Sequence, residues 1–132
     1  MDEKFDHYVW EQFENDCLKI AFWAKHKDFK NIYGIPRGGL ILAVKLSHVL
    51  DLPLILSKQD IIKKTLIVDD IVDTGKTIER LFFSLGYKPQ IASLYLGPET
   101  KIKPNFFLHR KKKWIVFPWE TNKSSKYDNI SF

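Results

Sequence analysis

A chain of 132 residues, 45% hydrophobic and 28% charged, has the size and composition of one small globular domain. No stretch approaches the run of about 18 apolar residues that a membrane span needs, and the single cysteine excludes an internal disulfide. The net charge of +5 suits a polyanionic substrate without requiring one. We expect one domain over residues 1–132, with a core over about 8–120 and a tail over 121–132, in a cytoplasmic protein.

The first half of the chain alternates helical and strand patterns. Between residues 8 and 26 apolar side chains recur at helical spacing, which predicts an amphipathic helix with Cys17 buried on its apolar stripe. Residues 31–35 and 54–56 predict strands, and the nearly apolar run 40–50 between them predicts a buried helix. This order of elements is typical of a parallel α/β sheet.

A Pro-Arg-Gly-Gly turn at residues 36–39 separates the first of these strands from the buried helix. A glycine-rich turn between a strand and a helix offers backbone N–H donors to an anion, and Arg37 adds a guanidinium suited to phosphate oxygens. A lone Arg-Gly-Gly is usually only a turn. This one gains meaning because it lies one β-α unit before the most informative stretch of the chain.

That stretch is residues 65–77, where an apolar run ends in Asp69 and Asp70 and a turn of small and hydroxyl residues follows. A helical pattern comes next, with one apolar face made by Ile78, Leu81, Phe82 and Leu85. Backbone N–H groups at Thr74 to Thr77 would begin that helix without intrahelical partners, so they can receive a phosphate. The two carboxylates would repel a phosphate; they suit sugar hydroxyls or a hard cation such as Mg²⁺.

Two other interpretations of this stretch are weaker. Gly75-Lys76-Thr77 looks like the end of a Walker A loop, but that pattern needs a glycine at position 70, where this chain has Asp70. An Asp-Asp pair can also merely cap a helix beside ordinary core residues. That interpretation leaves the rest of the pattern unexplained.

The second half predicts strands over 90–96 and 105–109, and a solvated turn at the basic run 110–113. Residues 57–64 leave room only for a tight turn between two strands. Residues 114–120, taken alone, predict a buried edge strand. The four histidines lack metal-ligand spacing.

Residues 68–77 resemble the phosphoribosyl-diphosphate-binding motif of the type I phosphoribosyltransferases: apolar residues, two acids, two apolar residues, then Asp-Thr-Gly-x-Thr. The resemblance implies a three-layer α/β/α domain with a mostly parallel central sheet. It also implies an enzyme that binds phosphoribosyl diphosphate with Mg²⁺, joins the ribose carbon to a nitrogenous base and releases diphosphate.

Two further segments resemble the same family. Residues 34–39 are similar to its diphosphate-binding loop, especially in the purine branch, and the family often holds a cis peptide there, at the bond that is Pro36–Arg37 in this chain. Residues 114–120 are similar to the base-binding segment of the bacterial xanthine/guanine phosphoribosyltransferases. The resemblance therefore implies transfer to a 6-oxopurine, namely guanine, xanthine or hypoxanthine, in purine salvage.

By this resemblance each site residue has a role. Asp69 and Asp70 would bind the ribose hydroxyls and Mg²⁺, and Glu120 would hold the same ion or its waters. The 5-phosphate would be bound by Asp73, Thr74, Gly75, Lys76 and Thr77, and the diphosphate by Arg37, Gly38 and Gly39. Trp114 would stack on the base, and Ile115 would contact it through its backbone. Asp73 would also be the catalytic acid/base beside the imidazole nitrogens of the purine.

The chain departs from the family pattern in two places. Residues 57–64 stand where most members insert a long mobile loop, so the catalytic loop is very short, with Lys58, Lys63 and Lys64 as partial electrostatic substitutes. Gly97 stands where purine members usually carry a lysine that reaches the exocyclic oxygen at position 6. Lys101 or Lys103 are the alternative sources of that charge.

These departures keep two alternatives open: a transferase for another base, and a non-catalytic regulator that senses phosphoribosyl diphosphate. We expect no membrane association and no nucleic-acid partner. The resemblance implies a homo-oligomer, a dimer or tetramer, for which Tyr127, Ile130 and Phe132 in the tail are candidate contacts.

Overall fold

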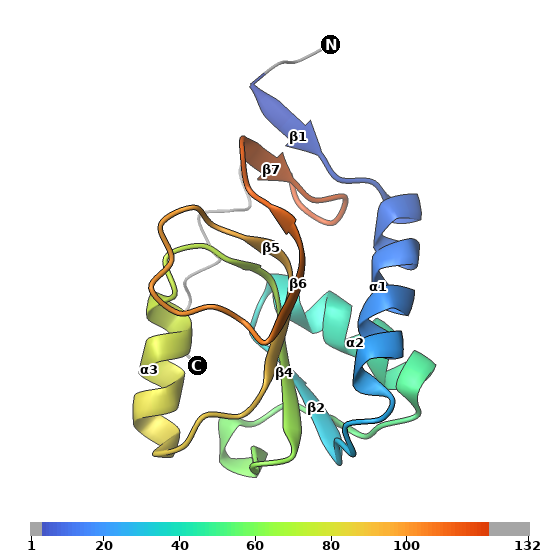
Figure 1. Cartoon of the computed structure of the whole chain (residues 1–132). Coiled ribbons are helices and arrows are strands. Elements are labelled where there is room, and N and C mark those ends of the chain that lie inside the picture. The colour runs from blue at the N-terminus through green and yellow to red at the C-terminus, as the bar shows by residue number, and fades with distance from the viewer. Residues whose placement is uncertain (1–3, 122–132) are drawn as a thin grey trace.

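In the computed structural model, described over residues 4–121, the strand that carries the two acids is central (Figure 1). Leu66, Ile67 and Val68 are 0% exposed, as expected of a strand covered on both faces. Its neighbours form a five-stranded sheet in the order β3-β2-β4-β5-β6 with every pair parallel. The strands are β2 (Asn31–Gly34), β3 (Leu54–Ile55), β4 (Thr65–Val72), β5 (Ile91–Leu96) and β6 (Phe106–Arg110).

Helices cover both faces of this sheet, which confirms the expected three-layer α/β/α arrangement. α1 (Trp10–Ala24) and α2 (Gly38–Leu50) lie on one face, and α3 (Lys76–Leu85) lies on the other (Figure 1). The apolar stripe of α1 is buried as predicted, and Cys17 on it is 0% exposed. Burial raises the pKa of the Cys17 thiol to about 12, because a thiolate would lose its hydration there.

α2 is less buried than its apolar sequence predicts. Leu42, Ala43 and Leu46 are fully buried, but Val44 and Val49 are 44% and 39% exposed. Because this helix packs on the sheet and on α1, only part of its circumference is covered by described residues. The expected buried helix is therefore buried on its inner face only, and the exposed edge predicted at Lys45 and His48 extends to Val44 and Val49.

A second, two-stranded sheet was not predicted. Phe5–His7 forms β1, which pairs in parallel with β7 (Trp114–Val116). The strand at 114–116 was expected, but its partner comes from the opposite end of the described chain. The first helix accordingly begins at Trp10 and not at residue 8.

A buried polar cluster joins α1 to the sheet near this second sheet. Asp16, 3% exposed, accepts a hydrogen bond from the Tyr8 hydroxyl at 2.6 Å and lies 2.7 Å from Nε2 of His109. Burial and the Asp16 carboxylate both raise the pKa of Tyr8 above its ordinary range. The cluster holds α1 against the end of β6.

The segment between β3 and β4 is short, as expected. It contains one 3-10 turn, η1 (Lys58–Asp60), in which the Ser57 hydroxyl accepts a hydrogen bond from the Gln59 N–H. Within residues 4–121 no helix has the length and apolar character needed to cross a membrane. The candidate contacts Tyr127, Ile130 and Phe132 lie outside the described residues.

Candidate active site

A cleft of about 890 Å³ opens at the carboxyl ends of β2 and β4, the usual ligand position in parallel α/β sheets. Nearly all the predicted site residues line it: Arg37, Gly38, Asp69, Asp70, Asp73, Thr74, Gly75, Lys76, Thr77, Trp114, Ile115 and Glu120. Gly39 does not line the cleft, because it is buried beneath the surface there. Tyr33 forms part of the floor, where burial raises its pKa to about 12.

The start of α3 forms one end of the cleft. The Thr74 hydroxyl accepts a hydrogen bond from the Lys76 N–H at 3.3 Å, and the first helical bond runs from the Glu79 N–H to the Gly75 carbonyl. The first turn of a helix presents N–H groups without intrahelical partners, together with the positive end of the macrodipole. This geometry can bind a phosphate, as predicted from the residue pattern.

Gly75 is required here for two reasons. Its φ is +86°, in the left-handed region, and a Cβ would lie 2.8 Å from the Thr100 hydroxyl oxygen. The missing side chain leaves a space beside this turn. In the structure the space is taken by the segment after β5, which packs on the turn before α3.

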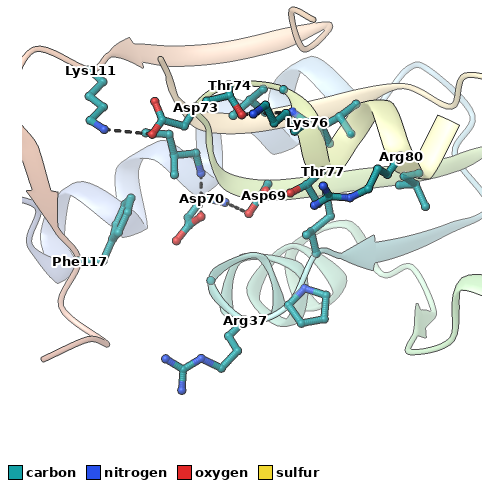
Figure 2. Close-up of a pocket in the computed structure, with 18 of the residues that line it drawn as sticks. Arg37, Asp69, Asp70, Asp73, Thr74, Lys76, Thr77, Arg80, Lys111 and Phe117 are labelled. Atoms are coloured by element: carbon teal, nitrogen blue, oxygen red, sulfur yellow. Dashed lines mark hydrogen bonds and ion pairs between the residues drawn. The ribbon is translucent and has the colours of Figure 1, made fainter. Parts of the chain in front are cut away.

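Asp69 and Asp70 lie within β4, which continues to Val72, rather than at the strand's end. Each carboxylate accepts a backbone N–H from the next residue at 2.8 Å, Asp69 from Asp70 and Asp70 from Ile71. Figure 2 shows both acids between the turn at the start of α3 and Arg37. These bonds fix the carboxylates at the cleft before any ligand binds.

The loop of Arg37 approaches the two acids closely. Pro36–Arg37 is a cis peptide bond, as the resemblance implied. Gly38 and Gly39, expected to form a turn, are the first residues of α2. Their lack of side chains matters because a Cβ at Gly38 would lie 1.9 Å from Oδ2 of Asp70, and one at Gly39 would lie 2.6 Å from the Val68 carbonyl oxygen.

At the other end of the cleft lie Trp114, Ile115 and Lys111, a lysine expected to lie in a solvated turn. Trp114 is 53% exposed and presents its ring, whereas Ile115 is 5% exposed. Nζ of Lys111 lies 3.1 Å from Oδ2 of Asp73 and 5.1 Å from the centre of the Trp114 ring. The prediction of a solvated turn over 110–113 is therefore wrong at Lys111, although Lys112 and Lys113 are exposed.

Glu120 lines the cleft too, and its Oε1 accepts the Phe117 N–H at 3.1 Å. Within residues 4–121 no group of three His, Cys, Asp or Glu side chains is close enough to hold a metal ion alone. The carboxylates of Asp69, Asp70 and Glu120 are nevertheless of the type that Mg²⁺ prefers. That ion commonly takes one or two carboxylates and completes its shell with substrate oxygens and water, so the donor set fits it.

Arg80, Phe117 and Lys111 also line the cleft and were not predicted (Figure 2). Arg80 lies one helical turn after the residues expected to bind phosphate, so its spacing from Lys76 could have indicated it. Lys58 reaches the cleft, but the other four candidate lysines do not line it: Lys63, Lys64, Lys101 and Lys103.

The fold is that of the type I phosphoribosyltransferases, and comparison with known proteins identifies the branch of this family. A xanthine-guanine phosphoribosyltransferase of Desulfotalea psychrophila is 31% identical over 135 residues, covering 85% of this chain and 84% of that protein. The solved purine phosphoribosyltransferase of Pyrococcus horikoshii has a TM-score of 0.78 and 34% identity over 89% of this chain and 95% of its own.

The solved xanthine-guanine-hypoxanthine phosphoribosyltransferase of Helicobacter pylori also has a TM-score of 0.78, with 28% identity, covering 89% of this chain and 93% of its own. No family model matches the chain. The chain belongs to the family of the xanthine-guanine phosphoribosyltransferases and is an enzyme of the phosphoribosyltransferase class.

Proposed function

We propose that this enzyme transfers the 5-phosphoribosyl group of phosphoribosyl diphosphate to a 6-oxopurine and releases diphosphate. The observation that carries this proposal is that the start of α3, a pair of carboxylates and an exposed aromatic ring share one cleft. Its volume of about 890 Å³ lies within the range of small-molecule sites.

The phosphoribosyl group would lie along the β4–α3 junction. The backbone from Asp73 to Thr77, with the Thr74 and Thr77 hydroxyls, binds the 5-phosphate. Asp69 and Asp70 accept hydrogen bonds from the ribose hydroxyls. Arg37 and the Gly38 N–H at the start of α2 bind the diphosphate, because a guanidinium and a helix N–H group both suit phosphate oxygens. Gly39 lies beneath the cleft, and its N–H donates to the Ile35 carbonyl.

When bound with the diphosphate, Mg²⁺ would neutralise the charge that develops on the leaving group; Asp69, Asp70 and Glu120 would hold the ion or its waters. The base would stack on Trp114 and contact the backbone of Ile115. In the transfer the bond from the ribose carbon to the diphosphate oxygen breaks, its electron pair leaves with diphosphate, and a carbon–nitrogen bond forms. Asp73 accepts the proton that the imidazole ring of the purine loses.

The test is diphosphate release from phosphoribosyl diphosphate and Mg²⁺, with guanine, xanthine, hypoxanthine, adenine, uracil and orotate offered in turn. We expect release that depends on an oxopurine. Release with uracil or orotate alone would favour a transferase for another base. Binding of phosphoribosyl diphosphate without release would favour the sensing regulator that the short segment at 57–64 leaves open.

Asp70→Asn tests the site itself. Loss of the negative charge should weaken the binding of phosphoribosyl diphosphate with Mg²⁺ by roughly tenfold or more in calorimetry, because an amide is a poorer ligand for Mg²⁺. Asp60→Asn, on η1 outside the cleft lining, is the control. Unchanged affinity in Asp70→Asn would contradict the assignment.

A further inference from the structure

Lys111 occupies a position between the two groups that the proposed reaction uses at the base. Its backbone N–H donates to the Leu96 carbonyl at 2.9 Å, which fixes the residue at the ends of β5 and β6. From there the side chain reaches Asp73 (Figure 2). Its Nζ also lies over the ring of Trp114, and only 19% of the side chain is exposed. An ordinary surface lysine would leave its ammonium in water.

Position 97, at the end of β5, is a glycine and supplies no cation to this part of the cleft, whereas Lys111 at the end of β6 does. The Gly97 N–H donates to the Val72 carbonyl, and a Cβ at Gly97 would lie 2.3 Å from the carbonyl oxygen of Asp73 and 2.7 Å from its Cα. A side chain at position 97 therefore cannot fit beside this backbone. The absence of that side chain lets the Asp73 turn pack against the end of β5, within reach of Lys111.

The two charged groups match one edge of a purine. Guanine presents N7 and O6 side by side on one edge, whereas adenine presents N7 beside an amino group that donates hydrogen bonds. The Lys111 ammonium lies 3.1 Å from the Asp73 carboxylate. With Asp73 facing the imidazole nitrogen N7 of a bound purine, this ammonium would lie beside the substituent at position 6. An ammonium has three donors and no acceptor, so it pairs with a carbonyl oxygen and is mismatched with an amino group.

We infer that Lys111 is a specificity-determining residue that selects a base with a carbonyl oxygen at position 6 over one with an amino group. The inference rests on the proposed function, since the base must stack on Trp114 with its imidazole edge toward Asp73. Of the four basic residues 110–113, Lys111 is the one that lines the cleft. Arg110 lies over the Phe107 ring instead.

The test compares Lys111→Met, which keeps much of the aliphatic stem, with Lys112→Met as a matched control on an exposed neighbour. The measurements are kcat/KM for hypoxanthine and for adenine, and the Kd of phosphoribosyl diphosphate. We expect Lys111→Met to lower kcat/KM for hypoxanthine by about 10- to 100-fold while that for adenine stays equal or rises. Lys111→Arg, which keeps a cation, should retain part of the preference, and Lys112→Met should match the wild type.

Two results would overturn the inference. An unchanged preference in Lys111→Met would mean that the ammonium does not contact the base. An equal loss with both bases would mean that Lys111 only holds Asp73 in place. If Lys111→Met fails to fold, Lys111→Gln takes its place, and its amide, which both donates and accepts, should abolish the preference.

Failure of the proposed function can be separated from failure of this inference. If the wild type releases diphosphate with none of guanine, xanthine, hypoxanthine and adenine, transfer to a purine is refuted, and Lys111 is tested by calorimetry with inosine monophosphate and adenosine monophosphate. Tighter binding of the inosine nucleotide that disappears in Lys111→Met supports the inference. Equal affinities of the wild type for the two nucleotides overturn it.

Discussion

Replacing Gly38 by alanine should weaken substrate binding while leaving the fold nearly intact. The new Cβ would lie 1.9 Å from Oδ2 of Asp70, where non-bonded contact needs roughly 3.5 Å, so the two must separate by about 1.6 Å. The carboxylate is the end of a rotatable side chain and can yield. Because alanine is also about 1 kcal/mol better than glycine within a helix, we expect the free energy of unfolding to stay within about 1 kcal/mol of wild type.

The displaced Asp70 carboxylate would no longer contact the ribose hydroxyls or hold Mg²⁺. A misplacement of about 1 Å in a positioned group can reduce a rate about 100-fold, which corresponds to roughly 2.7 kcal/mol. We therefore expect kcat/KM for phosphoribosyl diphosphate to fall by about that factor in a diphosphate-release assay. Urea unfolding of the same variant measures the fold independently.

Gly39→Ala is the matched comparison on the next residue. Its Cβ would lie 2.6 Å from the Val68 carbonyl oxygen, an atom of the central strand that cannot rotate away. This variant should lose about 1–3 kcal/mol of unfolding free energy. Wild-type kinetics in Gly38→Ala, or equal destabilisation of the two variants, would refute the reasoning.

Three other predictions address the buried cluster, the thiol and the base. Asp16→Ala leaves the Tyr8 hydroxyl and His109 without their shared acceptor, so urea unfolding should show a loss of about 2–4 kcal/mol; a loss under about 1 kcal/mol would contradict this. Cys17 has its pKa raised from 9.0 to about 12, so its contribution to stability is complete below pH 9 and is lost as the pH rises toward 12. Between pH 8 and 10 the free energy of unfolding should fall by about 1.4 kcal/mol through this thiol, and this fall should be absent from Cys17→Ala. The same pH dependence of unfolding in both proteins would contradict the raised pKa of Cys17. Trp114→Ala should raise the KM for the base about 10- to 100-fold with little effect on that for phosphoribosyl diphosphate, whereas equal changes in both would argue against stacking.

The sequence predicts most of the sheet and the cleft because their signals are local. The apolar run before Asp69, the turn at Gly75 and the helical pattern from Ile78 each lie within a few residues. Parallel strands then bring the loops after β2 and β4 to one edge without further information. The cis peptide at Pro36–Arg37 was expected only through the family resemblance.

The features that were missed depend on contacts between distant residues. β1 has only three residues, and its strand conformation is set by pairing with β7. Lys111 is one of four consecutive basic residues, and the sequence does not show which of them turns inward. That choice follows from the hydrogen bond between the Lys111 N–H and the Leu96 carbonyl, which fixes the register at the end of β6.

The pairing of β1 with β7 has a practical consequence for anyone who engineers this protein. The ladder aligns Phe5 with Trp114 and Asp6 with Ile115, and the Asp6 carboxylate accepts a hydrogen bond from the Tyr95 hydroxyl at 3.2 Å. The residues proposed to contact the base are thus supported from the amino-terminal side of the chain. An affinity tag or truncation that disturbs residues 5–7 would remove the strand that pairs with Trp114 and Ile115, so kinetic comparisons between variants need identical amino-terminal ends.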